Sequence, residues 1–228
     1  MSSRSQITLQ KAVSEFSGLI YEKGWVANHD GNISARLADE KRFMVTPTAE
    51  SKRGVVPHDT LVVDMEGKRL SGRKRLFSEW HLHATCFKAR PDVNAVIHAH
   101  PIYATAIGVA KASIGIPTLP EMVVSLGANI PTLDYAMPKS VAQEMALAQA
   151  LTQGDADGVL LSGNGVIVVG VDLEQAFLRL ELIEHYAQIL SVAASFGGAK
   201  PMPSQDLEAL LAKRTAAGLG RAGRVQSN

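Results

Sequence analysis

Two histidines, His98 and His100, lie one residue apart at the end of an apolar segment that Pro101 closes. The preceding Val96 and Ile97 favour an extended backbone, in which side chains two residues apart point to the same face. The two imidazoles can therefore lie side by side and supply half of the ligands of a divalent metal. The same spacing also fits an ordinary pair of surface histidines, so the segment by itself leaves both interpretations open.

A carboxylate, Glu79, stands at the start of a predicted helix over 78–90, and this position has a structural explanation. Ser78 can cap the helix, and the helix dipole favours a carboxylate in the first turn. His81 and His83 repeat the H-x-H pattern within this helix, where residues two apart point to different sides. We therefore expect these two histidines at the surface or at a subunit contact.

The segment 28–34 contains a predicted turn, at Asp30 and Gly31, that leads into a strand. Small polar residues and exposed backbone amides at such a turn can cradle an anion, although a solvated hairpin turn fits equally well. We interpret the basic runs at 52–53, 68–69 and 73–75 as solvated charge. Lys52 is in addition a candidate contact for an anionic substrate, because it follows the turn at Thr48.

Hydrophobic periodicity predicts the elements that position these residues. Apolar residues at helical spacing indicate helices over 9–20, 78–90, 102–110, 120–124, 141–151 and 172–196, the last with Asp172 and Gln175 in capping-box positions. Short strands are expected over 43–45, 60–65, 95–99, 159–161 and 166–169, and a loop over 131–138. Without a repeat or a linker, we expect one domain over 1–228, with a flexible tail from about residue 213.

Composition limits the classes of function. The chain has 228 residues, of which 46% are apolar and 20% charged, as in ordinary globular proteins. A net charge of +1 argues against a broad basic face for nucleic acid, and no apolar stretch is long enough to span a membrane. The single cysteine, Cys86, excludes an internal disulfide and is expected to be a buried thiol. An N-terminus without an apolar signal segment completes the prediction of a cytoplasmic protein.

Five short motifs, in their order and rough spacing, resemble the class II aldolase/adducin family over residues 24–196. They are Gly31-Asn32-Ile33-Ser34, Thr46-Pro47-Thr48, Ser78-Glu79, His98-Ala99-His100, and Gly163-Asn164-Gly165 ahead of Asp172-Leu173-Glu174-Gln175-Ala176. The resemblance implies an α/β class: a single-domain three-layer α/β/α fold with a mostly antiparallel central sheet. It also implies a homotetramer with active sites at subunit interfaces.

The resemblance further implies a carbon–carbon lyase of the class II aldolase type. Such an enzyme cleaves a hydroxycarbonyl substrate through a metal-stabilised enediolate. The implied cofactor is a divalent metal, usually Zn2+, with Mn2+ or Co2+ as alternatives. By position in the motifs, Glu79 is the catalytic acid–base group and His98 and His100 are metal ligands. The implied contacts to the anionic end of a small-molecule substrate are Asn32, Thr48 and Ser78.

Three features depart from the family pattern. Asn164 stands where the family has a third histidine ligand, and an amide oxygen is a weaker zinc ligand than imidazole. Phe77 stands where phosphate-binding members have a serine, which favours a more apolar substrate pocket. His29 and Asp30 replace small residues in the first turn, and we count His29 as a further candidate substrate contact.

These departures leave two alternative functions open. Some members of the family are metal-dependent decarboxylases of hydroxylated aromatic acids, and Phe77 favours this alternative slightly, with Glu79 then serving as proton donor. Adducin-type members are non-catalytic interaction modules without a metal site. The presence of Glu79 with both histidines argues against such a module, whereas Asn164 argues for it.

Overall fold

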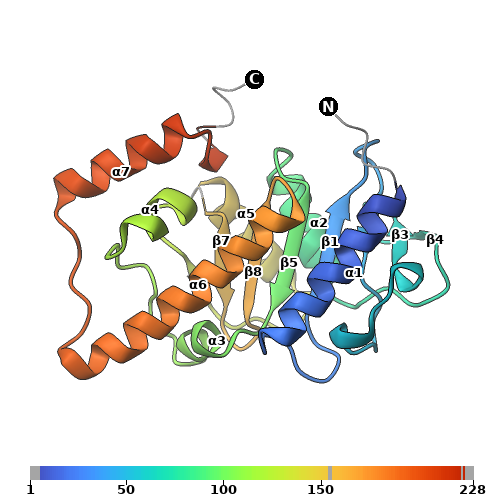
Figure 1. Cartoon of the computed structure of the whole chain (residues 1–228), viewed down its shortest axis with the longest axis horizontal. Helices are drawn as coiled ribbons and strands as arrows, with labels where there is room; N and C mark the ends of the chain where they lie inside the picture. Colours follow the sequence, from blue (N-terminus) through green and yellow to red (C-terminus); the bar gives the residue numbers. More distant parts are fainter. Residues whose placement is uncertain (1–5, 154–155, 222, 224–228) are drawn as a thin grey trace.

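The computed structural model describes residues 6–153, 156–221 and 223. Its centre is an eight-stranded sheet in the order β4-β3-β2-β1-β5-β8-β7-β6 (Figure 1). The strands are β1 Asn32–Arg36, β2 Phe43–Val45, β3 Leu61–Val63, β4 Arg69–Ser71, β5 Ala95–Ala99, β6 Thr132–Leu133, β7 Gly158–Leu161 and β8 Val166–Gly170. Neighbouring strands are antiparallel except for the parallel pair β6 and β7. The mostly antiparallel sheet is confirmed, with one parallel pair at its edge.

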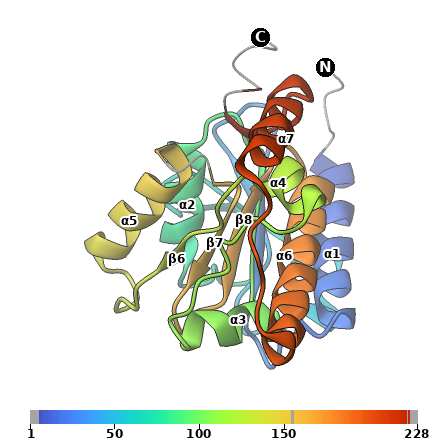
Figure 2. The ribbon, with the colours of Figure 1, turned by 90° about the vertical axis from the view of Figure 1, so that its left-hand side faces the viewer.

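Helices cover both faces of this sheet, as the edge-on view shows (Figure 2). Helices α1 and α6 lie on one face, and α2 and α5 lie on the other. The helices are α1 Gln6–Glu22, α2 Trp80–Ala89, α3 Ile102–Val109, α4 Pro120–Leu126, α5 Val141–Thr152, α6 Leu173–Ala193 and α7 Ser204–Ala216. Short 3-10 turns are η1 Lys52–Gly54, η2 Pro57–Asp59 and η3 Ala194–Phe196. The expected three-layer α/β/α fold is confirmed.

Strand β5 contributes to both cores, because its side chains alternate between the two faces. Ile97 packs into the apolar cluster that includes residues of α1 and α6, and Val96 packs into the cluster that includes residues of α2 and α5. Every residue of β5 is buried. His98 is two residues from Val96, so its side chain points to the same face of the sheet, toward the α2 layer. The alternation that builds the two cores thus also sets the direction of this histidine.

Two local expectations are corrected by the structure. Helix α2 begins at Trp80, so Ser78 does not cap it; Glu79 takes the N-cap position and makes no side-chain capping bond. The side chain of Glu79 is thereby available for other contacts. The predicted loop over 131–138 contains strand β6, because this segment pairs in parallel with β7.

The expected flexible tail from about residue 213 is corrected where the chain is described. Helix α7 continues to Ala216, and Arg214 is only 2% exposed. The Arg214 guanidinium donates to the carbonyls of Val124 and Ser125 and pairs with Asp157 at 2.6 Å. These contacts attach α7 to α4 and to the start of β7. Residue 222 and residues 224–228 lie outside the described residues.

Cys86 is a buried thiol within α2, as expected from the sequence. Burial raises the pKa of this thiol, so it stays protonated and unreactive at neutral pH. Over the described ranges, every helix is too short or too polar to cross a bilayer.

Asp157 is a fully buried carboxylate that joins helices from both layers. It lies 3.1 Å from Arg90 at the end of α2, and 2.6 Å from both Arg179 of α6 and Arg214 of α7. Arg90 also pairs with Asp92 at 2.8 Å. Three buried guanidinium groups therefore share the single charge of Asp157, which makes this carboxylate a structural centre of the fold.

Replacement of Asp157 should destabilise the fold strongly. In Asp157→Asn, buried positive charge loses its counterion, and we expect the free energy of unfolding to fall by about 3–5 kcal/mol. Urea denaturation followed by circular dichroism measures this change. Asp206→Asn, at an exposed position of α7, is the matched control, and equal stability of the two variants would contradict the structural role.

Candidate functional site

Four elements bring the sequence-predicted residues together. Asn32 on β1 lies directly opposite His98 on β5 in the antiparallel ladder. Asn164 lies in the turn between β7 and β8, and Glu79 immediately precedes α2. Asn32, Asn164 and His98 all contact the Glu79 carboxylate. The site thus combines residues from both halves of the sequence at one end of the central strands.

The Glu79 carboxylate accepts two amide hydrogen bonds, from Asn32 Nδ2 at 3.0 Å and from Asn164 Nδ2 at 2.8 Å. His98 Nδ1 lies 3.3 Å from Glu79 Oε2. Burial raises the pKa of Glu79, but the nearby positive charge of His98 and the two amide donors outweigh burial and hold the pKa well below its ordinary value. The carboxylate is therefore ionised at neutral pH.

His98 is fully buried, and both of its ring nitrogens face acceptors. Nε2 lies 2.7 Å from the backbone carbonyl oxygen of Asn164, which can only accept, so Nε2 carries a proton. Nδ1 faces Glu79 at ion-pair distance but without hydrogen-bond alignment. Burial lowers the pKa of His98, but the adjacent Glu79 and the Asn164 carbonyl more than offset this effect and raise it. A positive charge, from a proton or a metal ion, is favoured between His98 and Glu79.

His100 lies beside His98, with ring centroids 5.3 Å apart and an interplanar angle of 63°. Its Nδ1 lies 3.2 Å from Asp30 Oδ2, and its Nε2 is buried without a hydrogen-bond partner among the described residues. Burial and the charge of His98 lower the pKa of His100, and the opposing effects of Asp30 and Glu79 are smaller. His100 is therefore a neutral imidazole, the form that binds metal ions.

The donor chemistry of this site fits a divalent metal. His98 Nδ1 and His100 Nε2 are both buried and without hydrogen-bond partners among the described residues. The ionised Glu79 lies next to the first of these nitrogens, and imidazole nitrogens and carboxylate oxygens are common zinc ligands. Within the described ranges, no three His, Cys, Asp or Glu side chains are already grouped as a complete metal site. The metal-ligand roles of His98 and His100 stay predictions, with which the position of these two nitrogens is compatible.

Comparison with known proteins identifies the family of this chain. The model of the Class II Aldolase and Adducin N-terminal domain matches residues 11–191. The chain belongs to this family. L-Fuculose phosphate aldolase of Escherichia coli (strain K12) is 30% identical over 177 residues, covering 77% of this chain and 79% of the relative. The L-fuculose phosphate aldolase of Methanococcus vannielii is 29% identical over 178 residues, covering 78% of this chain and 93% of the relative.

A solved structure of L-fuculose 1-phosphate aldolase has the same fold as this family member. It superposes with a TM-score of 0.80 at 24% sequence identity, covering 90% of this chain and 94% of that chain. At this identity the likeness establishes the fold alone. It confirms the class II aldolase architecture that the sequence motifs imply.

Asn164 departs from the expected family pattern, and the structure shows which contacts it makes. Its side-chain Nδ2 donates to Glu79, and its backbone carbonyl accepts from His98. The residue therefore holds both groups by hydrogen bonds. Its expected role as a metal ligand through the amide oxygen stays a prediction.

His83 was expected at the surface or at a subunit contact, and this expectation is wrong. The residue is completely buried. Its Nε2 lies 2.5 Å from Asn32 Oδ1, and its Nδ1 lies 2.6 Å from Ser34 Oγ. Because an amide oxygen only accepts, His83 donates from Nε2 and accepts the Ser34 hydroxyl proton at Nδ1. Burial lowers the pKa of His83 well below its ordinary value, so the ring is neutral.

A directed series of hydrogen bonds therefore runs from Ser34 through His83 and Asn32 to Glu79. It determines that the amide nitrogen of Asn32, not its oxygen, faces the carboxylate. Asn32 is buried and its amide is engaged at both ends, so it holds Glu79, and its expected contact with substrate stays a prediction. The sequence did contain a signal: Asn32 and Ser34 share a strand face, and His83 follows Glu79 by four residues.

The other expected substrate contacts lie at the edge of this network. The backbone amide of Thr48 donates to the Arg75 carbonyl at 2.9 Å, which places the Thr48 turn beside the segment that leads to Ser78. Thr48 is half-buried and Ser78 is exposed. His29 is exposed in the turn before β1. Substrate contacts by these three residues stay predictions.

Phe77 is a core residue in this structure, and its expected role as an apolar substrate contact stays a prediction. It is 6% exposed and belongs to the core under α2. Its ring lies 5.0 Å from the ring of His83 and 6.3 Å from that of Trp80. Phe77 therefore packs behind His83, because its apolar ring gains more from burial than from exposure at the site.

Lys52 is not solvated either. It is 2% exposed, and its ammonium donates to the carbonyls of Glu50 at 3.0 Å and His29 at 3.3 Å. Burial lowers the pKa of Lys52, although the charges of Asp30 and Glu50 oppose this effect. Lys52 thus braces the turn that carries His29 and Asp30, and its expected contact with an anionic substrate stays a prediction.

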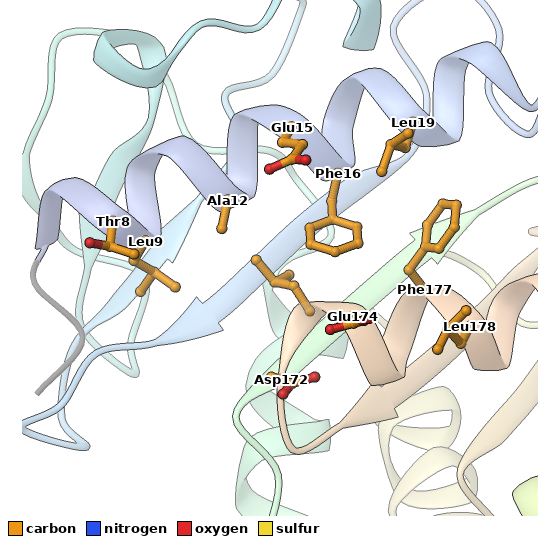
Figure 3. A pocket seen from close by; sticks show the side chains of 11 residues that line it. Thr8, Leu9, Ala12, Glu15, Phe16, Leu19, Asp172, Glu174, Phe177 and Leu178 are labelled. Carbon is orange, nitrogen blue, oxygen red and sulfur yellow. The ribbon is translucent and has the colours of Figure 1, made fainter. Parts of the chain in front are cut away.

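A separate groove lies on the opposite face of the sheet, between α1 and α6 (Figure 3). It has a volume of about 620 Å³. Phe16 and Phe177 approach each other there with ring centroids 5.6 Å apart, and Glu15 and Glu174 also line the groove. None of the predicted site residues lines it, so this groove is distinct from the candidate site.

Removal of His83 should destabilise the protein. His83→Ala leaves the Asn32 oxygen without its donor and creates a cavity, and we expect the free energy of unfolding to fall by about 2–4 kcal/mol. Urea denaturation provides the measurement. His185→Ala, at an exposed position of α6, should change stability by less than about 0.5 kcal/mol; a similar small change for His83→Ala would contradict the hydrogen-bond series.

Proposed function

We propose that this protein is a divalent-metal-dependent lyase of the aldolase type, which cleaves a carbon–carbon bond in a hydroxycarbonyl compound. The observation that carries the proposal is the convergence of Glu79, His98 and His100, with two imidazole nitrogens that have no hydrogen-bond partner among the described residues and one ionised carboxylate. Membership in the class II aldolase and adducin family supports it. The named relatives are L-fuculose phosphate aldolases, which favours a sugar phosphate as substrate.

The metal-binding groups in this proposal are His98 Nδ1 and His100 Nε2, because both nitrogens are buried and have no hydrogen-bond partner among the described residues. Glu79 and the amide oxygen of Asn164 are candidates for further ligands. Zn2+ is the first choice, with Mn2+ and Co2+ as alternatives. A bound ion would supply Lewis-acid stabilisation for the negative charge that develops on substrate oxygens as the bond breaks.

Glu79 is the proposed acid–base group. Its carboxylate is ionised, so it can accept the hydroxyl proton that a hydroxycarbonyl compound releases when its carbon–carbon bond breaks. The same oxygen can then return the proton to the carbon that carried the broken bond. Asn32 and Asn164 hold the carboxylate in place through both of its oxygens. The side chain therefore does not have to change conformation before it transfers the proton.

The two alternative functions receive less support. The decarboxylase alternative is favoured only slightly by Phe77, through a more apolar pocket, and this ring is buried in the core. The interaction-module alternative predicts that the polar site is lost, whereas Glu79 and His98 still form a closely connected buried network. We therefore put forward the aldolase-type lyase.

We further propose the homotetramer that the family resemblance implies, with active sites between subunits. Tyr135 is 61% exposed, and its ring lies 3.4 Å from where a Cβ atom on Gly163 would be. Gly163 is adjacent to Asn164, so a large exposed aromatic side chain borders the site. The homotetramer therefore rests on the family resemblance, and Tyr135 is the exposed residue near the site that such a subunit contact would cover.

Turnover should depend on Glu79. With zinc present, the wild-type protein is expected to cleave a ketose phosphate such as L-fuculose 1-phosphate, measured by coupled detection of the released carbonyl fragments. Glu79→Gln removes the proton acceptor while preserving shape, and kcat should fall by about 100- to 10,000-fold. Screening further sugar phosphates, hydroxyketones and hydroxy-aromatic acids covers other substrates. A fully active Glu79→Gln enzyme would remove Glu79 from the mechanism.

Metal binding should depend on the two histidines. Loss of a residue that only hydrogen-bonds a metal ligand lowers metal affinity by about 10- to 100-fold. In His98→Ala or His100→Ala a ligand itself is lost, so zinc affinity should fall by more than this. Competition with a chromophoric chelator measures the affinity. His58→Ala, whose side chain is 85% exposed, should bind zinc like the wild type, and unchanged affinity in all three variants would refute the assignment.

A further inference from the structure

Asp30, in the turn before β1, uses its two carboxylate oxygens for two different contacts. Oδ1 accepts from the backbone amide of Ala27 at 2.5 Å, and Oδ2 lies 3.2 Å from His100 Nδ1. The Asp30 amide in turn donates to the Ala27 carbonyl at 3.0 Å. The turn therefore holds the Asp30 carboxylate in place independently of its contact with His100.

From this geometry we infer that Asp30 is a positioning residue, which orients His100 and selects the tautomer that presents Nε2 to a metal. The inference rests on the proposed metal-dependent function. A carboxylate oxygen 3.2 Å from Nδ1 favours a proton on that nitrogen of neutral His100, because a carboxylate can only accept. The lone pair is then on Nε2, the nitrogen that is buried without a hydrogen-bond partner among the described residues. The residue acts on the metal site through His100 without touching the metal.

The backbone around His100 is held to the same turn segment. The His100 amide donates to the Trp25 carbonyl at 2.8 Å. Gly165 lies against the ring: a Cβ atom there would come within 2.3 Å of both His100 Cδ2 and the Ala99 carbonyl oxygen. Because these contacts limit movement of both backbone and ring, Asp30 acts on an imidazole with little freedom to rotate.

A second charge supports Asp30 from the interior. The buried ammonium of Lys52 donates to the carbonyl of His29, the residue before Asp30. Its positive charge also interacts favourably with the Asp30 carboxylate. Lys52 therefore holds the backbone of the turn and places a positive charge near the carboxylate that faces His100.

The inference has a chemical consequence for this chain. A carboxylate that accepts the distal N–H of a ligating histidine makes that histidine a stronger ligand. The position that supplies a third imidazole in the resembled family pattern is Asn164 here. Asp30 therefore strengthens one of two remaining imidazoles at a site that has lost a third.

The first test examines the metal-free protein. With 15N-labelled histidine, NMR at pH 8 distinguishes a ring protonated on Nδ1 from one protonated on Nε2, and His100→Ala identifies the His100 signals. The wild type should carry the His100 proton on Nδ1. In Asp30→Ala the proton should move to a mixture of both nitrogens. A wild-type ring protonated on Nε2 would overturn the inference, whatever the protein does with metals.

The second test measures zinc affinity by competition with a chelator. Asp30→Ala should bind zinc about 10- to 100-fold more weakly than the wild type, and Asp30→Asn keeps the size of the side chain if Asp30→Ala does not fold. The matched control is Asp64→Ala, because Asp64 also accepts a turn amide, that of Lys68 at 2.8 Å. This control should bind zinc like the wild type.

The outcomes distinguish a failure of the proposed metal-dependent function from a failure of the proposed role of Asp30. If the wild type binds no zinc, the proposed function fails, and the NMR result still decides the tautomer of His100. If the wild type binds zinc and Asp30→Ala and Asp30→Asn bind it equally well, the metal role of Asp30 is refuted while the proposed function stands. Equal weakening in Asp30→Ala and Asp64→Ala would also refute it, since general turn destabilisation would then explain the loss.

Discussion

The partly buried contact between Glu79 and His98 is the interaction on which the rest of the site depends. A carboxylate removed from water is costly unless charge and hydrogen bonds compensate for its lost hydration. Glu79 receives two amide donors and a neighbouring imidazole, and His98 receives the carbonyl of Asn164 on its far nitrogen. This need for compensation explains why the polar residues of the interior converge here.

The sheet supplies the rigidity that this contact requires. In the antiparallel ladder, His98 pairs with Asn32 on one side and with Ile167 on the other. A slip of one residue would turn His98 away from α2 and into the opposite apolar core, where it has no polar partner. Gly31 permits the tight entry into β1 with φ +72°, at a position where a Cβ atom would collide with Val26. Backbone register and side-chain chemistry are thus determined together.

Asn164 and Asp30 give this chain its own version of the family site. Asn164 contributes one side-chain donor and one backbone acceptor, so it holds Glu79 and His98 in a fixed relation. Asp30 contributes an acceptor to His100. Both residues lie in turns that meet at the ends of central strands, where loops can change without altering the core. The chemistry of the site can therefore vary while the sheet stays the same.

The sequence by itself predicted features with a short range along the chain. The two-residue period of a strand placed His98 and His100 together, and helical periodicity located α1, α3, α5 and α6 close to their observed bounds. Asp172 caps α6 by accepting from the Gln175 amide, only three residues away. The motif order identified the family and hence the layered fold, because such motifs are local patterns.

Only the tertiary structure decided which distant residues meet. His83 reaches Asn32 across 51 positions of sequence, and Arg214 reaches Asp157 across 57 positions. In the sequence, Lys52 resembles a solvated charge and Arg214 falls within the expected flexible tail, because local patterns do not report the carbonyls and carboxylates that surround a folded side chain. Burial of a polar group becomes favourable only once its partners are in place, and those partners come from elements that pack together after the local structure has formed.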